Sequence, residues 1–186
     1  MSRFNCFEAP LNGLKIIHRK ALEDERGFLS RIFCAETFSQ YGFGKAVNQI
    51  NQSLTSQQGS VRGLHYQLTP YTEIKLVSCI KGEVLDIAVD LRKDSPTFLH
   101  WHGEVLSESN RRSLLIPEGF AHGFQTLTDD CEMLYLHSSP YVEESESAIN
   151  IADPKLAITL PLAITDISER DKSHPMMNNN FEGIVL

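Results

Sequence analysis

The chain has 186 residues, 41% of them hydrophobic, and a formal net charge of -7. This length and apolar content suit one domain with a substantial core, and the acidic balance argues against a general nucleic-acid binder, which needs a broad basic surface. No apolar stretch has the length of a secretion signal or a membrane span, so we expect a cytoplasmic protein. The four cysteines lie far apart, without the spacing of a zinc site or disulfide scaffold, and are expected to be reduced.

Short strands are expected through most of the first half of the chain. Strands are predicted at 14–17 and 28–33, joined by a charged turn in which Gly27 can take unusual backbone angles. A helix is predicted at 34–41 with Gly42 as its stop, followed by a strand at 47–54.

Two alternating runs in the middle of the chain, 61–67 and 74–80, are predicted to be strands and carry a candidate base. Their chemically active side chains are those of Arg62, His65 and Lys75. If Lys75 points inward, it is costly to bury without an anionic partner.

The run 83–92 shows the clearest alternation in the sequence. Apolar residues at every second position alternate with Asp86, Ala88 and Asp90, which predicts a strand with one face on a core. The Lys81-Gly82 pair before it predicts a hairpin turn back from the preceding strand.

More short strands are expected in the rest of the chain, at 98–106, 113–116, 122–127, 131–137 and 156–160. The stretch 168–172 is expected to be a short helix or a loop. Many short strands with regular turn signals indicate an all-β protein, an antiparallel sandwich or barrel.

The stretch 117–122 has the spacing P-x-G-x-x-H. Together with three upstream residues it resembles the two-motif pattern of the cupin jelly roll, a double-sheet β-barrel with a central cavity; the three are His65, Glu73 and Gly82. Many cupins bind a metal through H-x-H, a glutamate and a later histidine, but Gln67 stands where the second histidine would be. A carboxamide is a poor substitute for imidazole, so we expect neither a metal nor another cofactor.

The chain as a whole resembles the dTDP-4-dehydrorhamnose 3,5-epimerase family, from about Leu14 to Pro175. The resemblance is carried, in order, by residues 24–28, 48–53, 61–67, 75–77, 116–124, 135, 141, 153–154 and 168–171. It implies one cupin-like domain over 1–186, with a core at about 14–162 and a C-terminal segment, 163–186, packed on it. It also implies an isomerase that acts in deoxysugar synthesis for surface polysaccharides.

The resemblance implies a reaction and roles for individual residues. A proton next to the ketone of a nucleotide-linked 4-keto-6-deoxy sugar is removed, and another is returned from the opposite face. His65 would be the base, oriented by Asp171, with Tyr135 as the acid and Lys75 stabilising the enolate oxygen. The family's substrate contacts correspond to Arg26, Gln49, Asn51, Arg62, His122, Tyr141, Glu146 and Arg170. Of these, Arg26 and Arg62 would hold the diphosphate or the sugar. Tyr141 would stack on the base, and Glu146 and Arg170 would make outer contacts to the nucleotide.

Several features of the reaction stay open at this stage. Family members act at carbon 3, at carbon 5 or at both, and Arg31 stands where a glutamate usually contacts the nucleotide base, so GDP- or CDP-sugars are alternatives to dTDP-sugars. A metal-dependent cupin oxygenase would use His65, Glu73 and His122, and a non-catalytic sugar-nucleotide binder would need no acid and base. The resemblance further implies a homodimer formed by exchange of N-terminal strands.

Overall fold

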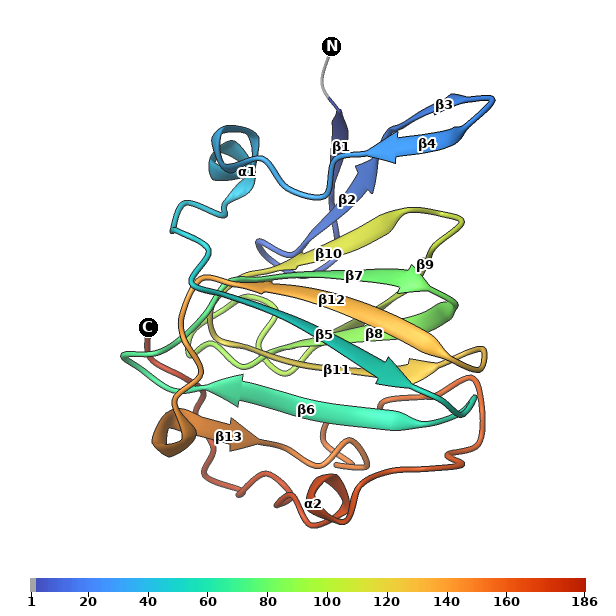
Figure 1. Cartoon of the computed structure of the whole chain (residues 1–186). Coiled ribbons are helices and arrows are strands. Elements are labelled where there is room, and N and C mark those ends of the chain that lie inside the picture. Colours follow the sequence, from blue (N-terminus) through green and yellow to red (C-terminus); the bar gives the residue numbers. More distant parts are fainter. Residues whose placement is uncertain (1–2) are drawn as a thin grey trace.

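The computed structural model describes residues 3–186 as two antiparallel sheets that face each other (Figure 1). One sheet has six strands, in the order β1 (Phe4–Glu8), β2 (Lys15–Arg19), β10 (Arg112–Ile116), β7 (Lys75–Lys81), β12 (Cys131–His137) and β5 (Gln49–Thr55). The other has five, in the order β13 (Glu146–Ala148), β6 (Val61–Gln67), β11 (Phe120–Thr126), β8 (Glu83–Asp90) and β9 (Trp101–Ser107). The prediction of an all-β, jelly-roll architecture is confirmed.

The remaining elements are short. A separate hairpin is formed by β3 (Ala21–Asp24) and β4 (Gly27–Ser30). The helices are α1 (Ala35–Tyr41), the 3-10 turn η1 (Glu143–Ser145) and α2 (Glu169–Lys172). Helix α1 ends as predicted at Gly42, which takes a left-handed φ of 111°.

Three apolar clusters form the core. Val77, Ala88 and Phe124 belong to the cluster between the sheets. A second cluster lies where the C-terminal segments cover the outer face of the five-stranded sheet, and a third where α1 packs on the six-stranded sheet. The open end left between the sheets is therefore the place where polar side chains can gather.

The alternation of the 83–92 run does not separate core from solvent. Asp86 and Asp90 are both 0% exposed, because this face of β8 points between the sheets while the other face is covered by the C-terminal segment. The predicted hairpin at Lys81-Gly82 is also wrong, since β7 and β8 lie in different sheets. Gly82, with a φ of 77°, instead turns the chain from one sheet to the other.

Strands β6 and β12 have the predicted bounds, and the four cysteines are free, as expected. Strands β1, β3 and β13 were not predicted, and 156–160 forms no strand. Within residues 3–186, no helix is long and apolar enough to cross a membrane.

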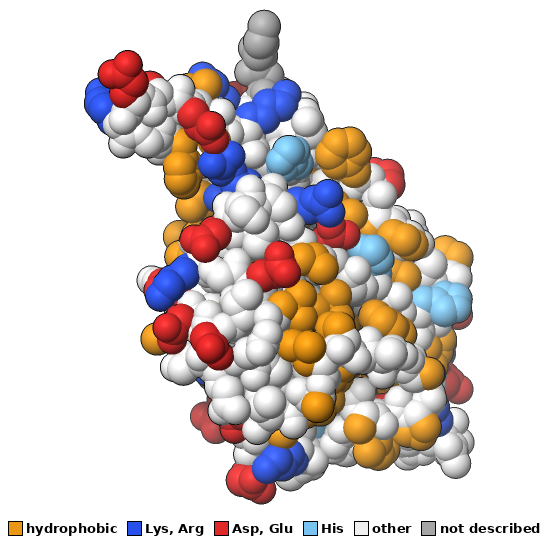
Figure 2. Space-filling model, turned by 90° about the vertical axis from the view of Figure 1, so that its right-hand side faces the viewer, with side chains coloured by type: hydrophobic (Ala, Val, Ile, Leu, Met, Phe, Trp, Pro, Cys, Tyr) orange, Lys and Arg blue, Asp and Glu red, His pale blue; other side chains and the backbone are white. Residues whose placement is uncertain are grey.

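The β3–β4 hairpin projects from the body of the protein and pairs with neither large sheet (Figure 1). Its exposed hydrophobic side chains are Leu22, Phe28 and Leu29, the last 71% exposed. Hydrophobic side chains also gather on one face of the molecule (Figure 2). Surface of this kind is typical of an interface with another chain.

Candidate active site

A pocket of about 640 Å³ opens between the two sheets. Strands β5, β7 and β12 supply one wall, β6 and β11 the other, and α2 with the region around β13 closes the rim. Every predicted site residue except Arg26 lines it: Gln49, Asn51, Arg62, His65, Lys75, His122, Tyr135, Tyr141, Glu146, Arg170 and Asp171.

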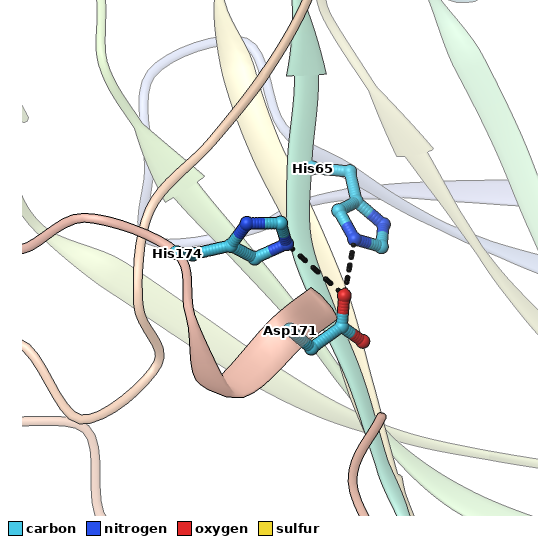
Figure 3. Close-up of side chains that lie close together, drawn as sticks. All are labelled: His65, Asp171 and His174. Atoms are coloured by element: carbon cyan, nitrogen blue, oxygen red, sulfur yellow. Dashed lines mark hydrogen bonds and ion pairs between the residues drawn. The ribbon is translucent and has the colours of Figure 1, made fainter. Parts of the chain in front are cut away.

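His65 and Asp171 form a hydrogen-bonded pair at the wall made by β6. His65 Nε2 lies 2.9 Å from Asp171 Oδ1 (Figure 3). Burial alone would raise the pKa of Asp171, but hydrogen bonds from His65, Gly63 and His174 lower it to about 2. The ionised carboxylate holds the proton of neutral His65 on Nε2 and leaves the lone pair on Nδ1, the arrangement a general base requires.

Two local features hold Asp171 in place. Ser168 caps α2, its hydroxyl oxygen accepting from the Asp171 backbone N–H at 3.0 Å. The Gly63 backbone N–H donates to Asp171 Oδ2 at 3.1 Å. This second contact depends on Gly63, which takes a φ of 109° where β6 passes close to β11.

Replacing Gly63 with alanine is expected to destabilise the protein by about 2–4 kcal/mol, because strain and overpacking add. A Cβ there would lie 2.6 Å from Gly123 Cα and 2.7 Å from the His122 carbonyl oxygen. Urea unfolding measures the change. Gly44→Ala is the matched control, since its Cβ would meet nothing within 4 Å; equal stability of the two variants would contradict the expectation.

Tyr135 lies on β12, in the sheet opposite His65. Its hydroxyl is 3.0 Å from Ser53 Oγ on β5. Burial raises the pKa of Tyr135 well above its usual value, an effect that the hydrogen bond to Ser53 only partly offsets. Tyr135 therefore keeps its proton at neutral pH and can serve as an acid.

Lys75 has the anionic partner that burial requires. Its Nζ lies 3.0 Å from Glu73 Oε1, and Glu73 Oε2 lies 2.7 Å from His137 Nδ1. Burial alone would raise the pKa of Glu73, but the charge of Lys75 and the contact with His137 bring it below the ordinary value. The carboxylate thus holds the ammonium group at the pocket wall.

His122 pairs with a buried carboxylate from the neighbouring strand. Its Nε2 is 2.7 Å from Asp86 Oδ1, and Asp86 is fully buried. His122 and His65 are direct partners across β11 and β6, so both imidazoles reach the same pocket.

The outer rim carries a second polar group. Glu146 forms an ion pair with Arg170 and accepts from the Tyr141 hydroxyl at 2.8 Å. The Tyr141 backbone N–H donates to Gln49 Oε1 at 2.9 Å, and the Tyr141 side chain is half exposed. An aromatic face is therefore presented to solvent at the mouth of the pocket, next to a guanidinium group.

Arg62 on β6 also lines the pocket, and its Nε donates to Thr55 Oγ1 at 2.9 Å. Arg26 is different. It lies at the tip of the β3–β4 hairpin, 89% exposed, and pairs with Asp24 at 2.6 Å. Within one chain it does not reach the pocket, because the hairpin projects from the body of the protein (Figure 1).

Four pocket or near-pocket partners were missed by sequence reasoning. His137 lies two residues after Tyr135 on β12 and shares its strand face, a signal that was available. Ser53 carried the same signal, because it lies two residues after Asn51 on β5. Asp86 and His174 had no such signal, because each is defined by a partner distant in sequence or by the path of a loop.

The fold and the site together define a class of protein: a cupin-type jelly roll whose pocket is lined by a His–Asp pair, a protonated tyrosine and a buried lysine. The chain matches the sequence profile of dTDP-4-dehydrorhamnose 3,5-epimerases over residues 8–179. It is 40% identical to the enzyme of that name from Shigella flexneri over 90% of this chain and 92% of the relative, and 40% identical to the one from Methanothermobacter thermautotrophicus over 97% and 98%.

Solved structures agree. The epimerase from Legionella pneumophila, crystallised with dTDP-4-keto-L-rhamnose, superposes with a TM-score of 0.89 at 42% identity, covering 93% of this chain and 92% of its own. A 3'-monoepimerase from Streptomyces bikiniensis, in complex with dTDP-quinovose, gives 0.83 at 33% identity, covering 90% and 85%. The chain belongs to the dTDP-4-dehydrorhamnose 3,5-epimerase family, a family of isomerases.

Proposed function

We propose that this protein epimerises a dTDP-linked 4-keto-6-deoxy sugar at carbon 3, carbon 5 or both, without a cofactor, in deoxysugar synthesis for surface polysaccharides. The observation that carries this proposal is that His65 and Tyr135 line one pocket from opposing sheets. A proton can then leave one face of the sugar ring and another can arrive at the opposite face.

The proposed reaction begins with His65 Nδ1, which takes the proton from the carbon next to the ketone. Asp171 stabilises the imidazolium that forms. Lys75 stabilises the negative charge that develops on the oxygen at carbon 4, a preorganised electrostatic contribution in a site partly closed to water. Tyr135 then protonates the carbon from the other side, and the configuration is inverted.

The rim residues are proposed to hold the nucleotide. Arg62 and Arg170 offer guanidinium groups suited to diphosphate oxygens. The exposed ring of Tyr141 is placed to stack on the base, while Gln49, Asn51 and His122 line the pocket as further substrate contacts. Glu146 contacts both Arg170 and Tyr141 and so keeps these two side chains next to each other.

Epimerisation assays with matched sugars test this function and the nucleotide preference. The 4-keto-6-deoxyglucose derivatives of dTDP, GDP and CDP are compared by kcat/KM, with product configuration read by NMR. We expect the dTDP derivative to be preferred and inverted. A GDP or CDP preference would contradict the dTDP assignment and direct attention to Arg31, and no turnover of any of the three would contradict epimerisation of this sugar.

Two other functions are disfavoured by the contacts of the pocket. A metal-dependent oxygenase would need His65, Glu73 and His122 together, but Glu73 binds the cation Lys75. Within residues 3–186, the side chains that come close enough to share an ion are instead His65, Asp171 and His174. A non-catalytic binder does not require the His65–Asp171 pair or a protonated Tyr135, and elemental analysis of the purified protein tests for a stoichiometric metal.

The projecting hairpin supports a homodimer as the active form. Leu22, Phe28 and Leu29 expose apolar surface that a second copy can bury. Arg26, stranded at the hairpin tip, would then reach the pocket of the partner subunit. The four unpaired cysteines suit the reducing cytoplasm, where we place this dimer.

Co-expression of two impaired variants tests the shared site. Arg26→Ala is expected to lower kcat/KM by about 10- to 100-fold through loss of charge-assisted hydrogen bonds, and His65→Ala is expected to be nearly inactive. Co-expressed as a mixed dimer population, they should recover about a quarter of wild-type activity, because half of the dimers are mixed and each has one intact site. Activity no higher than that of Arg26→Ala alone would contradict a role in the partner's pocket.

A further inference from the structure

His174 makes a contact that the proposed proton transfer does not use. Its Nε2 donates to Asp171 Oδ1 at 3.0 Å, the same oxygen that lies 2.9 Å from His65 Nε2 (Figure 3). The two imidazole rings meet edge to face, with their centroids 5.4 Å apart. The side chains of His174 and Asp171 are only 10% and 6% exposed, so water screens this contact weakly.

A carboxylate oxygen that accepts two N–H groups forms a weaker hydrogen bond with each of them than with a single donor. Every further donor stabilises the negative charge on Asp171 and weakens its attraction for a proton on His65. Gly63 occupies the other carboxylate oxygen, so His174 competes directly with His65 for Oδ1. His174 is therefore placed to oppose the proton affinity that Asp171 gives to the base.

We propose that His174 is a positioning residue that shares Asp171 with His65 and thereby sets the pH at which His65 becomes free to act as a base. The proposal rests on the proposed function, in which His65 is that base. With this contact, His65 stays unprotonated at a lower pH than it would if it shared Asp171 with no other donor.

The other charges around the pair are already matched. Glu146 on β13 faces His65 but is paired with Arg170. His122 on β11, the direct cross-strand partner of His65, is paired with Asp86. Lys172 on α2 is paired with Glu169, away from the pocket. These pairs stay in place when His174 is replaced, so a change in pH dependence can be attributed to the Asp171 contact.

Two variants with side chains of comparable size separate the hydrogen bond from packing. His174→Phe retains an aromatic ring against His65 but has no donor, whereas His174→Gln keeps an N–H donor that does not titrate. Exposed His100 lies at the far edge of the five-stranded sheet, and His100→Ala is the matched control. Assays contain EDTA, because two histidines and a carboxylate can also hold a transition metal.

The readouts are the pH profile of kcat/KM and the NMR titration of the His65 ring. We expect the acid-side midpoint to rise by about half to one pH unit in His174→Phe, the effect of one lost hydrogen bond. His174→Gln and His100→Ala should stay close to wild type. An unchanged midpoint in His174→Phe, or an equal shift in His174→Gln, would overturn the proposal and leave His174 a packing residue.

The two readouts also distinguish this inference from the proposed function. If no sugar nucleotide is turned over, the function is wrong, yet the titration of His65 still shows whether His174 governs its protonation. If turnover is found and the titration midpoint does not move, the function stands and the role of His174 is wrong.

Discussion

Replacing His65 with alanine is expected to reduce kcat by about 100- to 10,000-fold, the usual loss when a general base is removed. The reason is that the proposed reaction starts at His65, which an ionised carboxylate orients: Asp171, 5% exposed, accepts from His65 at 2.9 Å. Steady-state turnover of the dTDP-4-keto-6-deoxy sugar measures the effect.

The variant must keep its substrate for this result to be informative. The dissociation constant for dTDP, measured by calorimetry, is expected to be within a few-fold of the wild-type value, since the rim residues Arg170 and Tyr141 are unchanged. His100→Ala serves as the control for loss of an imidazole outside the pocket. A His65→Ala variant that retains most of its turnover would show that another group is the base.

Tyr135→Phe is expected to separate the two halves of the reaction. Without the hydroxyl, inversion should fall by about 100-fold or more because the acid is lost. His65 can still remove the proton and return one to the same face, so solvent deuterium should enter the sugar without a change of configuration. Product analysis in heavy water detects this exchange, and normal inversion by Tyr135→Phe would exclude Tyr135 as the acid.

The buried position of Tyr135 also predicts the alkaline side of the pH profile. Its pKa is raised, mainly by burial, so the phenol stays protonated and competent to about pH 10, the ordinary tyrosine value, and beyond. A group with a raised pKa loses its proton only at higher pH, so a fall in activity between pH 8 and 9 would have to come from another group. Ser53→Ala removes the hydrogen bond that partly offsets the raised pKa of Tyr135, so the alkaline loss of activity should not move to lower pH in this variant.

The sequence was most informative where a single strand carried the chemistry. The bounds of β6 and β12 were predicted correctly, since each alternates clearly and ends at a turn. A resemblance based on short motifs also located the pocket residues, although their roles remain proposals. Arg26 was grouped with them, but it lies on a hairpin that pairs with neither large sheet and does not line the pocket, and no local pattern in the sequence shows this.

Other features depended on packing that no local pattern reveals. The alternation of β8 was interpreted as core and solvent, but Asp86 and Asp90 are both buried. Asp86 pairs with His122, which is distant in the sequence. A buried carboxylate looks in sequence like an exposed one. The connection at Gly82 was also predicted to be a hairpin, but it crosses from one sheet to the other, and the local sequence does not distinguish these two kinds of turn.

The central claim is that His65 removes a proton next to the sugar ketone. It is tested most directly by incubating wild type and His65→Ala with dTDP-4-keto-6-deoxyglucose in heavy water and following carbons 3 and 5 by NMR. We expect deuterium at one or both carbons with wild type, together with inversion, and none with His65→Ala. Equal exchange by the two proteins, or no exchange by wild type, would contradict the account.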